Sequence, residues 1–149
     1  MQTLLRTTTP TVFLAVFAGP ALAIDPVFQD DGAAFRGYDP IAYFTEDGPV
    51  KGSPENSFSY QGAIRQFASA ENRDTFAADP EKYTPDYGGY CAWVVSQGHI
   101  APFDPGAWSI RDGRLYLNYS KTLRAQWALD KDGNIAAAAR NWPGLRDGS

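Results

Sequence analysis

Apolar residues recur near every second position in two stretches of the chain, and a short turn containing glycine interrupts each stretch. Strands with one buried face show this alternation, and a glycine-containing dipeptide between two such strands is typical of a β-hairpin. The two turns are Gln61-Gly62 and Asp112-Gly113. The flanking strands are expected at residues 58–60 and 64–67 around the first turn, and at residues 108–110 and 115–119 around the second.

Two helices are indicated by a serine placed ahead of an apolar pattern. Ser69 can cap a helix in which Asn72 stands where a capping box has Glu or Gln, and Asp79-Pro80 should end or restart that helix. Ser120 can cap a second helix, which carries Trp127 on its inner face. Both helices follow a predicted hairpin directly along the chain.

A third helix is expected after Asp132-Gly133, because its apolar residues recur at helical spacing. These residues are Ile135, Ala138, Ala139 and Trp142. Pro143 should end this helix, since proline lacks the backbone N–H that a helix interior needs. Nearer the start of the chain, Asp39 and Pro40 should begin a short helical turn that directs Ile41, Tyr43 and Phe44 inward.

These elements predict a single α+β domain over residues 24–149, in which two hairpins form a small antiparallel sheet and short helices cover one face. The chain contains 4 Trp, 8 Tyr and 9 Phe among its 149 residues. So many rings in one small domain favour a core packed largely by aromatic side chains, with the polar tips of Tyr and Trp needing partners.

Residues 1–23 have the pattern of a secretory signal peptide. Arg6 precedes the apolar run Val12–Ala18, and the small residues of Ala21-Leu22-Ala23 suit a cleavage site after Ala23. The apolar run is shorter than the roughly 20 residues that span a membrane. We therefore expect an exported, periplasmic protein with no membrane span in its mature form.

The formal charge of the chain is −4 at pH 7, and removal of the first 23 residues makes it one unit more negative, since Arg6 is the one charged residue removed. An acidic chain repels the phosphates of nucleic acids and of anionic membranes. No basic run interleaves with the aromatic residues. Neither nucleic acid nor a membrane surface is expected as a partner.

The segment Tyr87–His99 contains the only cysteine, Cys91, and the only histidine, His99. A structural zinc site needs four Cys or His ligands, and a blue-copper site needs two His and a Cys. Neither site fits within one chain. The arrangements left open for a copper or zinc ion are Cys91 and His99 with an oxygen ligand such as Asp104, a two-coordinate Cu(I) site, and a Cys2His2 site shared across a homodimer.

Thiol chemistry is the second possibility at this segment. If residues 87–98 form a short buried helix after Gly88-Gly89, with a strand as the alternative, Cys91 falls in the first turn of that helix. The helix dipole lowers a thiol pKa there, and His99 could act as a base if it folds back. A lone Cys among apolar residues is otherwise a small buried hydrophobic side chain. Tyr90, Trp93 and Trp108 are the residues that could wall a ligand pocket beside the thiol.

Five sequence stretches in order resemble the YHS-domain proteins of bacterial export pathways. They are GYDPIAYF (37–44), YGGYCAW (87–93), FDPGAW (103–108), DGRLYLNY (112–119) and NWPGL (141–145), and the resemblance covers residues 38–145. It implies an exported single-domain protein, and some relatives look like selenoproteins with selenocysteine at the place of Cys91. Other YHS modules are thought to bind metal through an Asp-Pro-Val-Cys motif, and the corresponding stretch here, YDPIAYF, has no Cys.

The expected function is therefore that of a binding module for a metal ion or small ligand, centred on Cys91. A single-cysteine redox enzyme or peroxide sensor is the first alternative. An interaction protein without chemistry, which binds a protein partner, is the second.

Overall fold

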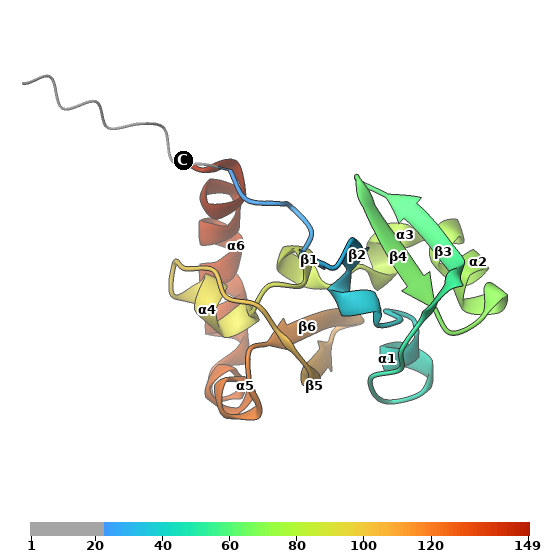
Figure 1. The fold of residues 1–149 in the computed structure, drawn as a ribbon. Coiled ribbons are helices and arrows are strands. Elements are labelled where there is room, and N and C mark those ends of the chain that lie inside the picture. The colour runs from blue at the N-terminus through green and yellow to red at the C-terminus, as the bar shows by residue number, and fades with distance from the viewer. Residues whose placement is uncertain (1–22) are drawn as a thin grey trace, which may run out of the picture.

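The computed structural model describes residues 23–149 and shows an α+β fold (Figure 1). The predicted signal peptide lies outside the described residues, apart from Ala23. The strands are β1 (Gln29–Asp30), β2 (Ala33–Ala34), β3 (Ser53–Tyr60), β4 (Ala63–Phe67), β5 (Asp104–Arg111) and β6 (Arg114–Asn118). The helices are α1 (Ala42–Thr45), α2 (Ala70–Ala78), α3 (Pro80–Tyr83), α4 (Ala92–Ser96), α5 (Lys121–Ala128) and α6 (Lys131–Asp147), with single 3-10 turns at Phe35–Gly37 and Asp86–Gly89.

The predicted α+β class and both predicted hairpins are confirmed. Each hairpin is a separate two-stranded antiparallel sheet, so β3–β4 and β5–β6 do not join, and β1–β2 forms a third pair. Figure 1 shows β3 and β4 beside α2 and α3, whereas α4, α5 and α6 lie together on the opposite side of the molecule. The short β1–β2 pair lies between these two groups.

All three hairpins turn through a dipeptide with left-handed backbone at both residues. The φ angles are 51° and 73° at Gln61-Gly62, 50° and 74° at Asp112-Gly113, and 51° and 77° at Asp31-Gly32. Positive φ at both central residues is the type I′ arrangement that matches the twist of the flanking strands. The sequence pattern did not predict the third hairpin, because its strands have two residues each and show no alternation.

The predicted serine caps are confirmed. The hydroxyl of Ser69 accepts a hydrogen bond from the Asn72 N–H at 3.1 Å, and that of Ser120 accepts one from the Leu123 N–H at 3.1 Å. Residues 92–96 form the short helix α4, so the helical alternative is the right one for this segment.

The predicted end of the last helix at Pro143 is wrong. Helix α6 runs through Pro143 to Asp147. Beyond the proline, Leu145 packs against the same apolar cluster as Trp142, one turn earlier. The burial of these side chains offsets the one backbone hydrogen bond that proline removes.

Within residues 23–149, the core consists of three apolar clusters rich in rings. Trp127 is completely buried, and its ring centroid lies 5.1 Å from that of Tyr116. The hydroxyl of Tyr43 donates to the Pro105 carbonyl at 2.9 Å, and that of Tyr90 donates to the Asp25 carbonyl at 2.9 Å. The polar tips of these two tyrosines thus have partners, whereas the buried Nε1 of Trp127 has none among the described residues. Among residues 23–149, no helix is long and apolar enough to cross a membrane.

Candidate functional site

The chain approaches Cys91 through a 3-10 turn in left-handed conformation, with φ of 58° at Tyr87 and 62° at Gly88. A Cβ at Gly88 would lie 2.0 Å from the carbonyl oxygen of Pro26. The backbone at Pro26 can therefore contact this turn only because residue 88 is glycine. Cys91 then takes the N-cap position of α4, with φ −56° and ψ 115°. The predicted placement in the first helical turn is therefore wrong by one residue.

The thiol of Cys91 is completely buried and faces a buried amide. Its Sγ donates to Oδ1 of Asn118 at 3.4 Å, and this same oxygen accepts the backbone N–H of Trp93 at 3.0 Å. On the backbone, the N–H of Cys91 donates to the Ala101 carbonyl at 3.0 Å. Asn118, at the end of β6, thereby joins the second hairpin to the start of α4.

The side-chain nitrogen of Asn118 lacks a hydrogen-bond partner. Asn118 is completely buried, and its Nδ2 donates to no atom of the described residues. The orientation of the amide follows from the Trp93 N–H, which needs an acceptor and so requires the oxygen at this place. A buried donor without a partner costs about 1–3 kcal/mol. The amide that contacts the only thiol through Oδ1 thus has an unused N–H donor group on its other atom, Nδ2.

Burial raises the pKa of the Cys91 thiol above its ordinary value. The backbone N–H groups of Val94, Tyr119 and Trp93 act in the opposite direction, because they stabilise a thiolate, but desolvation is the larger effect. The sequence-based hypothesis of a lowered thiol pKa at a helix start is therefore wrong for the folded protein. Cys91 rests as a protonated thiol.

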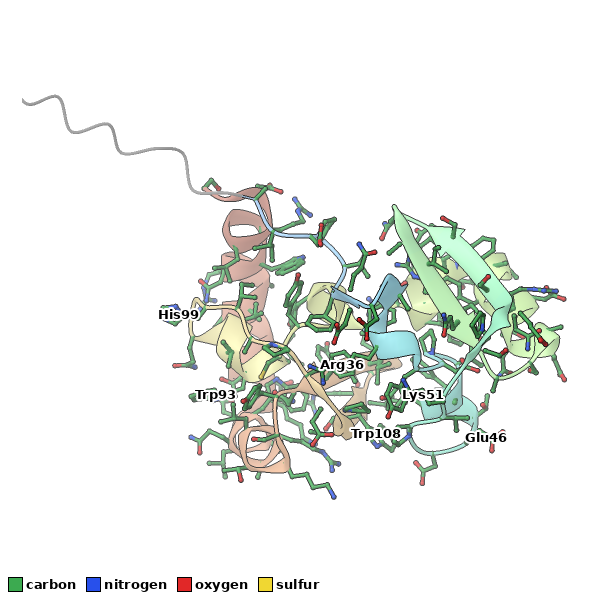
Figure 2. All side chains as sticks on the ribbon, viewed as in Figure 1. Arg36, Glu46, Lys51, Trp93, His99 and Trp108 are labelled. Atoms are coloured by element: carbon green, nitrogen blue, oxygen red, sulfur yellow. The ribbon has the colours of Figure 1, made fainter. Side chains whose placement is uncertain are left out.

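The structure does not bring the predicted metal ligands together. His99 is exposed on the loop after α4, and Figure 2 shows it at the outer edge of the molecule. The Oδ1 of Asp104 accepts the Gly106 N–H at 2.9 Å at the start of β5, which is a turn role. Within residues 23–149, no group of three or more Cys, His, Asp or Glu side chains could hold a metal ion.

The predicted pocket residues lie in different parts of the core. Tyr90 packs edge-on against Phe28 at 5.6 Å between ring centroids, whereas Trp108 packs against Tyr43 at 5.6 Å. Figure 2 shows Trp93 and Trp108 on separate elements, α4 and β5. A cavity of about 660 Å³ is lined by other residues, mainly from the segment 23–27, the β3–β4 turn and α6. These three aromatic residues therefore do not wall that cavity.

Asn118 is the site residue that the sequence reasoning missed. It follows Leu115, Tyr116 and Leu117, which are all buried, and an Asn that continues such a run is a signal of a buried amide with a specific partner. Its partner, Cys91, is 27 residues earlier in the chain, so spacing alone does not connect them.

Comparison of the chain with protein-family models, with curated proteins and with solved structures finds no match.

Proposed function

We propose that this chain is an exported thiol redox protein, in which Cys91 reacts with a peroxide and Asn118 stabilises the oxidised sulfur. The observation that carries the proposal is the buried amide of Asn118, whose Oδ1 contacts the thiol and whose Nδ2 has no hydrogen-bond partner among the described residues. Export is supported by the signal-peptide pattern of residues 1–23. The resemblance to YHS-domain proteins, some with selenocysteine at this place, also supports chemistry at position 91.

The polarity of the groups around Sγ favours an anion over a metal ion. The backbone N–H groups of Trp93, Val94 and Tyr119 are hydrogen-bond donors near the sulfur, and the one side-chain acceptor in contact with it within the described residues is Oδ1 of the neutral Asn118 amide. Donors stabilise a thiolate or an oxygen attached to sulfur, whereas a cation needs lone pairs from acceptors. Metal binding, the first function expected from the sequence, finds less support here than thiol oxidation.

The reaction follows the ordinary oxidation of a cysteine. Cys91 loses its proton, and its sulfur attacks one oxygen of the peroxide. The S–O bond forms as the O–O bond breaks, and the leaving oxygen takes up the proton as water or alcohol. The sulfur loses two electrons, which reduce the peroxide, and the new sulfenic oxygen accepts a hydrogen bond from Nδ2 of Asn118.

Recovery of the thiol requires a second reactant, because the chain has no other cysteine. A small thiol attacks the sulfenic sulfur, forms a mixed disulfide with Cys91 and releases water. A second molecule of this thiol attacks the mixed disulfide, restores Cys91 and leaves as the oxidised disulfide.

Burial of Cys91 controls when it reacts. The hydrogen bond between the Cys91 N–H and the Ala101 carbonyl attaches the loop that follows α4 to the backbone at the start of this helix. Opening of this loop admits water and removes the desolvation that raises the thiol pKa, while the N–H groups of Trp93 and Val94 stay in place beside the sulfur. The thiol therefore becomes more acidic, and more reactive, when it is exposed.

The test is trapping of the sulfenic acid. The mature protein is treated with hydrogen peroxide and dimedone, and the adduct is located by mass spectrometry. We expect one adduct, at Cys91, that is absent in Cys91→Ser and forms several-fold more slowly in Asn118→Ala. Asn134→Ala is the matched control, because it removes an amide whose Nδ2 already donates to the Trp127 carbonyl at 2.9 Å. Absence of an adduct in folded wild-type protein, under conditions in which glutathione is oxidised, would refute the proposal.

A further inference from the structure

A second cavity, about 360 Å³ in volume, lies among the β1–β2 hairpin, the turn that follows it and the β3–β4 hairpin. Its walls include Asp30, Asp31, Arg36, Lys51 and Gln66. Pockets that bind small molecules usually measure about 300–1,000 Å³. This cavity is large enough for a small ligand, and its lining carries charges of both signs.

The charges in this cavity are only partly paired, because Arg36 and Asp30 form an ion pair while the other two charges have no opposite charge as partner in the described part of the chain. The Nε of Arg36 lies 3.5 Å from Oδ2 of Asp30 but makes no hydrogen bond, and it is buried without a partner. Among residues 23–149, Asp31 belongs to no ion pair. Lys51 donates one hydrogen bond from Nζ, to the Arg36 carbonyl at 2.6 Å, which leaves two of its three protons for another acceptor.

The two cations are held in place by contacts outside the cavity. Arg36 donates from Nη1 to the Phe103 carbonyl at 2.8 Å, and its guanidinium lies 5.3 Å from the centroid of the Phe103 ring. The Nζ of Lys51 lies 4.6 Å from the centroid of the Tyr38 ring. Figure 2 shows Arg36 and Lys51 near each other at the centre of the view. Cations fixed in this way lose little side-chain entropy when a ligand binds.

The backbone at Arg36 is strained in a way that suits this arrangement. Phe35, Arg36 and Gly37 follow one another with φ of 55°, 55° and 75°. For a residue other than Gly, Asn or Asp, the left-handed conformation costs roughly 1–2 kcal/mol of conformational free energy. Residues with strained backbone are often found at ligand-binding sites, where the surrounding structure maintains their conformation.

We infer that this cavity binds a small zwitterion of the α-amino acid class. Its carboxylate would accept hydrogen bonds from the guanidinium edge of Arg36 at Nη2 and from Nζ of Lys51, and its ammonium group would lie against the carboxylates of Asp30 and Asp31. The larger cavity, of about 660 Å³, offers no such pairing. Its charged wall residues, Arg146 and Asp147, already bind each other through two hydrogen bonds of 2.7 and 3.1 Å.

The test is calorimetric titration of the mature protein with L-alanine and L-glutamine. N-acetyl-L-alanine, which lacks the ammonium group, and L-alaninamide, which lacks the carboxylate, serve as half-ligands. We expect saturable binding of at least one amino acid and about tenfold or more weaker binding of its half-ligands, since each loses charge-assisted hydrogen bonds. Absence of saturable binding for both amino acids at millimolar concentration overturns the inference.

Two variants with matched controls assign the binding to this cavity. Asp31→Asn and Lys51→Met should each weaken binding about tenfold or more, because each removes one charge that faces the ligand. Asp112→Asn is the control for Asp31, since both are left-handed residues before Gly in a hairpin turn, with φ of 50° and 51°. Lys82→Met is the control for Lys51, because Nζ of Lys82 also lies over a tyrosine ring, at 5.1 Å from that of Tyr83. Equal losses in variants and controls also overturn the inference.

Discussion

The carboxylate of Asp39 accepts a hydrogen bond from the side-chain amide of Asn72, 33 residues further along the chain, at 2.8 Å. The same oxygen, Oδ2, accepts the Ala68 N–H at 2.9 Å, and Oδ1 accepts the Ile41 N–H at 2.8 Å. Asp39 is completely buried. One carboxylate therefore joins the start of the α1 turn to the end of β4 and the first turn of α2.

Replacement of Asp39 by Ala should destabilise the protein strongly. The change leaves the donors of Ile41, Ala68 and Asn72 without their acceptor, and each buried orphan donor costs about 1–3 kcal/mol. We expect the free energy of unfolding, measured by urea denaturation, to fall by more than about 3 kcal/mol. Asp104→Ala is the control, since Asp104 is only half-buried and its Oδ1 accepts one N–H. Equal losses in the two variants would contradict this account of Asp39.

Truncation of Trp127 tests the aromatic core around α5. Trp127 is completely buried, and substitution of such a side chain by Ala costs roughly 3–5 kcal/mol. Denaturant unfolding of Trp127→Ala should show a loss of this size. Trp93→Ala should cost less, because Trp93 is only half-buried on α4. A loss under about 1 kcal/mol for Trp127→Ala, as at surface positions, would mean that the ring is not packed as described.

Pro143→Ala tests the continuity of α6. Because the helix runs through this position to Asp147, alanine can donate the backbone N–H that proline lacks. Helix propensity favours Ala over Pro by about 3 kcal/mol in a helix interior. The unfolded chain of the variant is more flexible, and this entropy offsets about 0.4–1 kcal/mol of the gain. A higher melting temperature is the expected result. A lower melting temperature would indicate that α6 ends near Pro143, as the sequence pattern predicts.

Local signals in the sequence predicted most of the fold. The glycine-containing turns at Gln61-Gly62 and Asp112-Gly113 and the capping residues Ser69 and Ser120 act within a few residues of chain. Their effects are therefore readable from sequence alone. Pro143 was misread because the packing of residues beyond it, which the helix rule ignores, maintains the helix.

The inward face of β4 was not predictable from the apolar pattern. Ile64 is 47% exposed, whereas its neighbour Arg65 is completely buried. Nη1 of Arg65 donates to the carbonyls of Tyr60 and Ala63 in the hairpin, and its guanidinium lies 5.0–5.7 Å from the centroids of three aromatic rings. Rings and carbonyls from several elements stabilise this cation. No single stretch of sequence contains that information.

The candidate site was predicted in part. Cys91 was identified because it is the only cysteine, but its complete burial depends on tertiary packing, and its partner Asn118 comes from the β5–β6 hairpin. The direction of the pKa shift was wrong for the same reason, because desolvation depends on tertiary packing. His99, identified as the only histidine, lies on the surface.

The raised pKa of Cys91 makes a prediction about stability in alkaline solution. An unfolded chain loses its thiol proton near pH 8.5, whereas the folded protein retains it to higher pH. Above about pH 8.5 the folded state therefore binds more protons than the unfolded state, and the free energy of unfolding must fall as pH rises. The slope contributed by this one group reaches at most about 1.4 kcal/mol per pH unit.

Cys91→Ala should remove this slope between about pH 8.5 and pH 9.5, even if the variant is less stable at every pH. Urea unfolding at pH 7.0, 8.5 and 9.5 under reducing conditions measures it. Tyr116→Phe is the control, because burial raises the pKa of Tyr116 to about 12, and its effect on stability begins only above the ordinary tyrosine value of about 10. Parallel profiles for wild type and Cys91→Ala would show that the thiol ionises as readily in the folded protein as in the unfolded chain. Cys91 would then be accessible without opening of the loop that follows α4, and burial could not control its reaction with peroxide.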